Sequence, residues 1–436
     1  MASSRDIYYA ERLSRMIQCK TVSVKDRFEQ EEFFKLREVI KDLFPMFVSE
    51  AELVILGDDA WLYKLKGKDE TRNVMLMSHH DVVDAEGEWE HDAFSGEIAS
   101  EKLWGRGTVD TKTPLFAEFT ALQELLTEGF VPSTNVYLFS SHNEEIAGDG
   151  ALLALDYFRE NNIEFEWIID EGGAIIDPPM AGIDKKCAMM AVHEKGRCVM
   201  KFTASKNTGH TGLAADSKTP AVKIANFITE VEKTKPFIRR MHPELRAMFE
   251  GLAPHMSFPM KFIFSHLNIF SGLLVKIIPK LNAAAGEMLG TSGTFRKLES
   301  AEDGGASVEY FLRCVNDKDQ EEDIKKLEAI AKNAGISSEI TEMEYYRPAN
   351  LNSAGYEYIK GITKASFDYA ACAPFILPAG TDARRFCDLS DAVVRFAPID
   401  IDSQQYASVH NLNENINVDK IALAVDFYKK LIREYK

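Results

Sequence analysis

Residues able to bind metal ions follow four short segments in the first half of the chain. Three of these segments are apolar and β-prone, and the fourth is a glycine-containing turn. They are Val74–Met77 leading to His79, Leu103–Val109 leading to Asp110, Val136–Ser140 leading to Glu144 and Glu145, and Trp167–Ile169 leading to Asp170 and Glu171. Open α/β sheets place their sites at strand ends, and zinc binds imidazole and carboxylate groups. The pattern therefore predicts a metal site assembled where these four segments end.

Asp81 stands two residues after His79 at the end of the first apolar segment. Positions two apart share one face of a strand. A carboxylate beside a metal-binding imidazole fixes its tautomer and raises its basicity. We therefore expect Asp81 to orient His79.

The order of these motifs resembles the M20 family of dinuclear zinc hydrolases, which includes aminoacylases, carboxypeptidases, dipeptidases and carnosinases. The motifs are SHHDVV, WGRGTVDTK, NEE and DEGG, followed late in the chain by His410–Glu414, similar to the family's HGxNE. The likeness covers nearly the whole chain. Within the family, Gly380–Arg384 and Val394–Pro398 are most similar to the branch of carboxypeptidase S and the N-acyl-amino-acid hydrolases.

The resemblance implies two zinc ions, or cobalt or manganese in their place, held by one bridging carboxylate and terminal ligands on each side. Carried onto this sequence, the ligands are Asp110 as the bridge, His79 with Asp170 or Glu171 on one metal, and Glu145 with His410 on the other. Both acids of the Asp170–Glu171 pair are present, so the choice between them stays open.

Glu144 is implied to be the general base, a carboxylate that binds no metal and takes a proton from the attacking water. Gly209–Thr211 is similar to a family element whose histidine, His210 here, reaches the partner subunit's site in a homodimer and stabilises the oxyanion. A homodimer is therefore expected. Asp81 completes the predicted catalytic group.

The predicted substrate-binding residues lie in the second half of the chain. Arg313 occupies the family position of an arginine that binds the substrate carboxylate, for which a planar bidentate donor is suited. Gly380, Thr381 and Arg384 resemble a loop that frames the substrate. The sequence departs from the family at Lys297–Asp303, where relatives carry Asn-Val-(Leu or Ile)-Pro.

Length and composition limit the class of protein. A chain of 436 residues predicts two domains. The net charge of −17 argues against nucleic acids and anionic membranes as partners, because both are bound through basic patches. Six cysteines without a regular framework indicate reduced thiols, and the first residues lack the apolar core of a signal peptide. We expect a cytoplasmic protein.

The predicted fold is α/β, with an α/β/α catalytic domain of the zinc-hydrolase type and an inserted, smaller α+β lid or dimerisation domain. Strands and helices alternate up to residue 170, and the family's EKG element at Glu194–Gly196 marks the start of the insert. The expected domains are residues 1–192 and 345–436 for catalysis and 193–344 for the insert.

Met256–Ile278 is unusually apolar, but polar residues interrupt it and no run of about 18 apolar residues exists. We therefore exclude a membrane span. Two interpretations stay open: a lid helix buried in a subunit interface, or an apolar wall for a hydrophobic substrate group.

The predicted function is zinc-dependent hydrolysis of the amide bond in small peptides or N-acyl amino acids that carry a free carboxylate. The alternative is a non-catalytic relative that keeps the fold as a binding or scaffold protein. Such relatives usually lose a ligand or the base, whereas this chain keeps all of them, which favours the enzyme.

Overall fold

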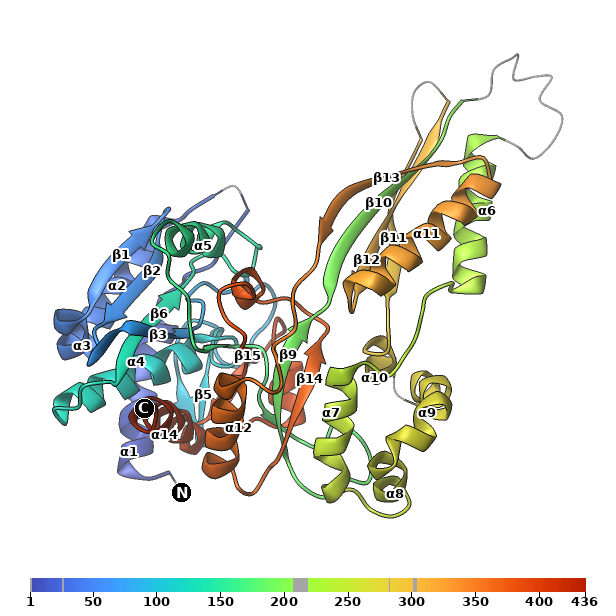
Figure 1. Ribbon diagram of the computed structural model, residues 1–436. Helices are drawn as coiled ribbons and strands as arrows, with labels where there is room; N and C mark the ends of the chain where they lie inside the picture. The colour runs from blue at the N-terminus through green and yellow to red at the C-terminus, as the bar shows by residue number, and fades with distance from the viewer. Residues whose placement is uncertain (1, 26, 207–218, 282, 301–303) are drawn as a thin grey trace.

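A nine-stranded mixed sheet forms the centre of the larger part of the molecule (Figure 1). The computed structural model describes residues 2–25, 27–206, 219–281, 283–300 and 304–436. In spatial order the strands are β1 (Glu52–Leu56), β2 (Ala60–Leu65), β6 (Thr134–Ser140), β3 (Asp69–Met77), β7 (Ile168–Asp170), β15 (Val393–Arg395), β9 (Cys187–Glu194) and β14 (Ala371–Leu377), and β8 (Ile175–Ile176) pairs with β9.

The three strands that lead to the predicted ligands are neighbours and run in the same direction. β3 lies between β6 and β7 and is parallel to both. Their carboxyl ends therefore meet at one edge of the sheet, where His79, Glu145 and Glu171 follow. The strands were expected at these places, and the parallel order brings their ends together as an α/β sheet requires.

Helices cover both faces of this sheet because alternate strand residues point to opposite sides. Leu76 packs with the helices of one face, whereas Met75 and Met77 pack with those of the other. The first face is covered by α1 (Ser4–Ile17), α2 (Gln30–Leu43), α3 (Pro45–Glu50), α4 (Lys112–Thr127), α12 (Ala354–Ser366) and α14 (Val418–Arg433). The second face is covered by α5 (Gly150–Glu160) and η3 (Asp382–Phe386). The α/β fold class is thereby confirmed.

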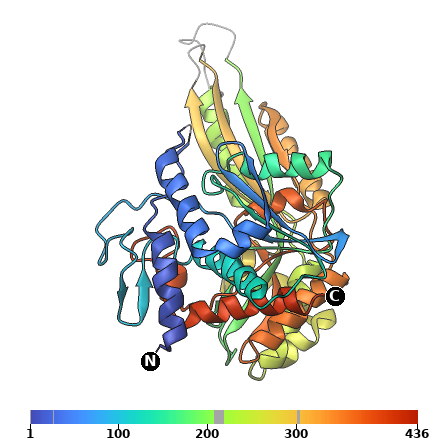
Figure 2. The same cartoon turned by 90° about the vertical axis from the view of Figure 1, so that its left-hand side faces the viewer.

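A second, four-stranded antiparallel sheet projects from one end of the large sheet as an arm (Figures 1 and 2). In spatial order its strands are β11 (Ser292–Ser300), β12 (Ala306–Cys314), β10 (Gly196–Ala204) and β13 (Ser337–Glu344). Alternate residues of β12 are buried against α6 (Pro220–Thr234) and α11 (Asp317–Asn333). The division into residues 1–192, 193–344 and 345–436 stays a prediction.

A helical segment from the middle of the expected insert packs against the large sheet. It contains α7 (Pro243–Leu252), η2 (Ala253–His255), α8 (Met260–Ser265), α9 (Leu267–Leu281) and α10 (Ala283–Glu287). Leu245, Phe249 and Leu274 share a buried cluster with Ala373 and Ile376 of β14. Met256–Ile278 therefore contains two helices that cover the edge strand of the large sheet, and the two interpretations of this segment stay predictions.

Two strands in the last part of the chain were not expected from the sequence. β14 is rich in small residues and contains Pro374, and β15 has only three residues, so neither carries a clear strand pattern. The remaining short elements are α13 (Ser403–Ala407) and a small sheet of β16 (Asn415–Asn417), β5 (Lys102–Trp104) and β4 (Ile98–Ala99). Over the described residues, every helix is too short or too polar to cross a bilayer.

Candidate metal centre

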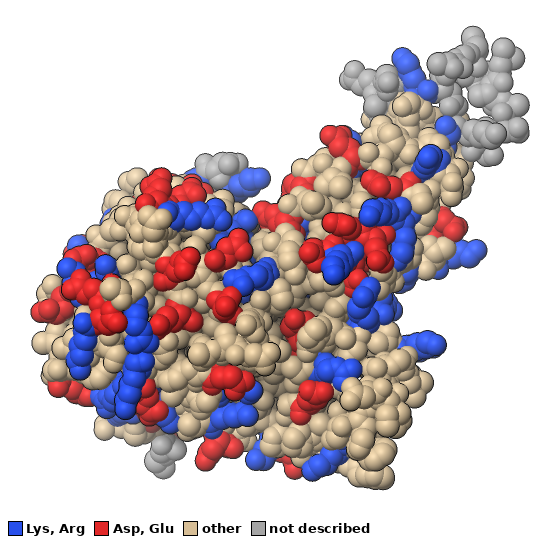
Figure 3. Space-filling view, viewed as in Figure 1, with Lys and Arg blue, Asp and Glu red and all other residues tan. Residues whose placement is uncertain are grey.

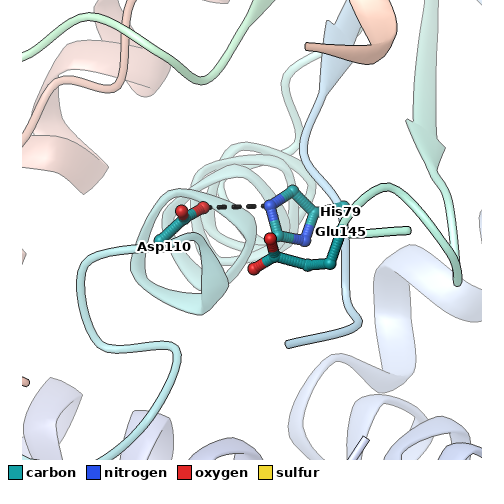
Figure 4. A group of neighbouring side chains, drawn as sticks. All are labelled: His79, Asp110 and Glu145. Atoms are coloured by element: carbon teal, nitrogen blue, oxygen red, sulfur yellow. Dashed lines mark hydrogen bonds and ion pairs between the residues drawn. The ribbon is translucent and has the colours of Figure 1, made fainter. Parts of the chain in front are cut away.

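Three predicted ligands from different elements lie together at the carboxyl edge of the sheet. Ligand atoms of His79, Asp110 and Glu145 all lie within 4.8 Å of one another. Figure 4 shows their side chains converging, His79 from the end of β3, Asp110 from the turn before α4 and Glu145 from the segment after β6. This donor set of one imidazole and two carboxylates suits a divalent metal ion.

The Asp110 carboxylate lies between two imidazoles. Its Oδ1 is 3.0 Å from His79 Nε2, and its Oδ2 is 3.2 Å from His410 Nε2. His410 Nε2 is also 2.9 Å from Glu145 Oε2. Hydrogen bonds to Asp110 and Glu145 raise the pKa of His410 to about 10. Burial alone would raise the pKa of Asp110, but its bonds to His410 and His79 lower it.

Asp81 serves two parts of the centre at once. Its Oδ1 is 3.3 Å from His79 Nδ1, so it can orient this ring as predicted. The same carboxylate accepts hydrogen bonds from the backbone N–H groups of Glu144 at 3.2 Å and Glu145 at 3.1 Å. Ser23 Oγ donates a further bond of 2.6 Å. The sequence pattern indicated only the contact with His79.

Glu414 fixes the turn that carries Asp110, a role that the sequence reasoning missed. Its carboxylate accepts hydrogen bonds from the N–H groups of Val109 at 2.7 Å and Asp110 at 3.1 Å. Arg106 pairs with it at 2.9 Å. Gly107 in this turn has a φ of 93°, which side-chain-bearing residues rarely adopt. Glu414 closes the late histidine motif, which was the available signal.

The two neighbouring acids after β7 have different surroundings. Asp170 is buried, and its Oδ1 and Oδ2 accept hydrogen bonds from the backbone N–H groups of Glu171 at 2.9 Å and Ala383 at 3.0 Å. The Glu171 carboxylate has no hydrogen-bond partner among the described residues. Burial and the charges of Asp110 and Asp170 raise its pKa well above the ordinary value.

Several acids of the centre have raised pKa values because burial and mutual repulsion disfavour their charged forms. They are Glu144, Glu145, Asp170, Glu171 and Asp382. Burial is the largest cause for each, and the pKa of Asp170 rises to about 6. Several acids with disfavoured charged forms in one place are the environment that divalent metal ions stabilise.

The predicted substrate loop lies beside Glu144. Arg384 Nη1 is 3.9 Å from Glu144 Oε1 and donates a 2.6 Å hydrogen bond to the Thr381 carbonyl. A Cβ on Gly380 would lie 3.1 Å from the same Arg384 nitrogen. The loop was predicted from the sequence, and in the structure it lies beside Glu144.

Arg313 extends from β12 toward the junction of the two sheets. Its Nη1 donates a 3.4 Å hydrogen bond to the Lys195 carbonyl. Burial lowers the pKa of Arg313, and the positive charges of Arg384 and Arg197 lower it further. Two predicted substrate-binding guanidinium groups are thus close enough to repel each other. His210 lies outside the described residues.

Comparison with known proteins identifies the family. The sequence profile of Peptidase family M20/M25/M40 matches residues 75–434. The chain belongs to this peptidase family. It is 28% identical to "Probable carboxypeptidase S-like 2" of Dictyostelium discoideum over 98% of this chain and 85% of that protein. It is 28% identical to "N-fatty-acyl-amino acid synthase/hydrolase PM20D1" of Xenopus tropicalis, over 97% of this chain and 85% of that protein.

A solved M20 structure has the same fold. The M20 family metallo-carboxypeptidase Sso-CP2 from Sulfolobus solfataricus superposes with a TM-score of 0.67 at 17% identity, covering 99% of both chains. The expectation of a metal-dependent amide hydrolase of the M20 family, acting on small peptides or acylated amino acids, is confirmed.

This M20 peptidase holds its predicted substrate loop through a buried ion pair that the sequence did not reveal. Arg395 Nε is 2.7 Å from Glu194 Oε1, and both side chains are 0% exposed. Glu194 also accepts hydrogen bonds of 2.9 Å from the backbone N–H and the Oγ1 of Thr381. The pair therefore connects β9 and β15 to the loop that carries Arg384.

We expect Arg395→Met to lower the free energy of unfolding by about 3–5 kcal/mol, because it leaves the Glu194 charge buried without its cation. Denaturant unfolding measures this change. Arg72→Met is the matched control: Arg72 and Glu166 form an ion pair with side chains 34% and 35% exposed, so its loss should cost at most about 1 kcal/mol. Equal losses in the two variants would contradict the role of the buried pair.

Proposed function

We propose that this M20 peptidase is a dinuclear metallohydrolase that removes the acyl group from amino acids or the C-terminal residue from small peptides. The observation that carries the proposal is the position of the Asp110 carboxylate between the imidazoles of His79 and His410. A single carboxylate with one oxygen toward each histidine is the arrangement that a bridging ligand needs.

The metal ligands are assigned by asking which carboxylates already accept hydrogen bonds from the protein. Asp110 bridges, His79 binds on one side, and Glu145 and His410 bind on the other. We assign the open choice to Glu171, because both oxygens of Asp170 accept backbone hydrogen bonds. The proposed metal is zinc, with cobalt or manganese as alternatives, since imidazole and carboxylate ligands suit all three. When bound, the metals supply Lewis acidity to water and to the scissile carbonyl.

Glu144 supplies the proton transfer. It follows the metal-facing strand β6, and Asp81 fixes its backbone. Burial and the neighbouring acids Asp382, Asp81 and Glu145 raise its pKa well above the ordinary value. A raised pKa favours acceptance of the water proton and its later donation to the leaving amine. The presence of this base beside the site disfavours the non-catalytic alternative.

The arginines indicate a substrate with a free carboxylate. Arg384 lowers the pKa of Arg313 and Glu194 raises the pKa of both arginines, so the two guanidinium groups share one charged region where an anionic substrate group would bind. The same group would bind both guanidinium planes through charge-assisted hydrogen bonds. N-acyl amino acids and small peptides both carry this carboxylate. Relatives named for carboxypeptidase and for N-fatty-acyl-amino acid hydrolysis agree with this substrate class.

We further propose a cytoplasmic homodimer in which residues 193–344 provide the dimerisation domain and His210 acts in the partner's site. The arm formed by β10–β13 ends in an exposed edge strand, β13, which supports an interface there. Free thiols at all six cysteines support a reducing compartment.

The base assignment is tested with two variants. Glu144→Gln should retain both metals and lower turnover roughly 10²- to 10⁴-fold, because the amide is isosteric but cannot accept the proton. Asp110→Ala should instead lose metal during dialysis, because the bridge is gone. Elemental analysis and hydrolysis of an N-acyl amino acid measure the two effects. Metal loss in Glu144→Gln, or a rate near that of the wild type, would exclude Glu144 as the base.

The role of Arg313 is tested with two substrates that differ in one group: an N-acyl amino acid with a free carboxylate, and the same compound with a carboxamide in its place. Arg313→Gln should raise KM for the carboxylate by roughly 10- to 100-fold, since hydrogen bonds to charged groups contribute about 1.5–3 kcal/mol. It should change KM for the carboxamide little. Arg197→Gln is the control, because Arg197 stands directly opposite Arg313 in the sheet and pairs with Glu342. Equal effects on both substrates would show that Arg313 does not bind the carboxylate.

The dimer proposal predicts complementation between two inactive variants. After subunit exchange, His210→Ala mixed with Glu144→Gln should regain roughly a quarter of wild-type activity per subunit, because half of the dimers are mixed and each has one intact site. Hydrolysis before and after exchange measures the recovery. If exchange is confirmed by mass spectrometry and the mixture stays inactive, His210 does not act across the interface.

A further inference from the structure

The helices that cover β14 expose large apolar side chains to solvent. Phe258 is 83% exposed, Phe262 49%, Ile269 73% and Leu273 56%. All four lie between η2 and the middle of α9, in a segment that the catalytic chemistry does not use. We call these four residues the outer apolar face.

On α9 this face is one stripe that continues into lysines. Ile269, Leu273, Lys276 and Lys280 follow one another at helical spacing, and all four are exposed. The opposite side of α9 carries Leu267, Leu274 and Ile278, which are buried in the cluster with β14. The exposed stripe is therefore not part of the core, and the fold is complete without covering it.

Ring contacts join α8 to the start of α9 next to this face. Phe262 of α8 lies 6.0 Å from the Phe270 ring of α9 in an edge-on arrangement, and 4.5 Å from the His266 ring. In the space-filling view, the surface over α8 and α9 carries few acidic side chains (Figure 3). Aromatic rings thus connect Phe262 of α8 with α9 beside the exposed stripe.

The local charge is opposite to that of the whole chain. Residues 251–286 contain no Asp or Glu and three lysines, in a protein with a net charge of −17. Lys261, Lys276 and Lys280 are exposed, and none has an ion-pair partner among the described residues. Lysines beside protruding aromatic and aliphatic residues are the composition of helices that lie in a membrane interface.

We propose that the outer apolar face and its three lysines dock on the surface of a bilayer that contains anionic phospholipid. The apolar side chains enter the boundary between headgroups and acyl chains, and the lysines attract the lipid phosphates. The total charge does not prevent this, because charges beyond about 8 Å from the surface are screened at physiological ionic strength. The expectation that excluded membranes rested on the total charge, whereas local residues determine docking.

Vesicle flotation tests the proposal with the full chain. Wild-type protein should float with vesicles of phosphatidylcholine and phosphatidylserine, less with phosphatidylcholine alone, and less as salt is raised. Phe258→Ser/Ile269→Ser/Leu273→Ser should weaken binding about ten-fold or more. Lys261→Glu/Lys276→Glu/Lys280→Glu should weaken it by roughly five-fold per lysine or more.

Matched controls separate the face from general surface effects. Val131→Ser/Leu298→Ser changes residues that are 48% and 68% exposed elsewhere, and Lys318→Glu/Lys325→Glu/Lys332→Glu changes the charge equally on exposed positions of α11. Both should bind as the wild type does. Absence of vesicle binding by the wild type, or equal weakening by the controls, overturns the proposal. Light scattering gives a further test. If the wild-type protein is a dimer and the apolar variant is a monomer, a second copy of the chain covers the face, and the proposal is overturned.

Discussion

Buried negative charge at the carboxyl edge of β3, β6 and β7 is the constraint on which the structure depends. Each buried carboxylate loses several kcal/mol of hydration unless protein groups replace it. Asp81 and Asp170 obtain backbone N–H donors from Glu144, Glu145, Glu171 and Ala383. The Glu171 carboxylate obtains none among the described residues. Some acids at this edge thus hold the loops through hydrogen bonds to backbone N–H groups, whereas others stay free to bind cations.

The loops at this edge are fixed by residues from distant parts of the chain. Glu414 accepts hydrogen bonds from the turn of Asp110, about 300 positions earlier, and so joins this turn to the segment that carries His410. Glu194 and Arg395 do the same for Thr381 on the other side of the centre. These contacts hold the segments that carry the proposed base and Arg384, and catalysis depends on such positioning.

The sequence predicted what local pattern and motif order encode. Strand ends after Val74, Val136 and Trp167 identified the candidate ligands, and β3, β6 and β7 lie where these apolar segments predicted strands. It could not separate Asp170 from Glu171, because the difference lies in N–H donors contributed by Ala383. It missed β14, whose Ala371–Leu377 lacks a β-branched pattern except at Ile376. The Glu194–Arg395 pair joins residues 201 positions apart, a separation that no local pattern reports.

The net charge of the whole chain also differs from the charge of single surface segments. The net charge of −17 describes the whole chain, but some acids at the candidate centre, such as Asp81 and Asp170, are buried and unavailable to partners. Residues 251–286 lack acids altogether, so this surface has the opposite sign from the average. Electrostatic interactions in salt solution extend only about one Debye length. A partner therefore interacts with the charges near its own contact surface. Charge must be considered for each element separately once the fold is known.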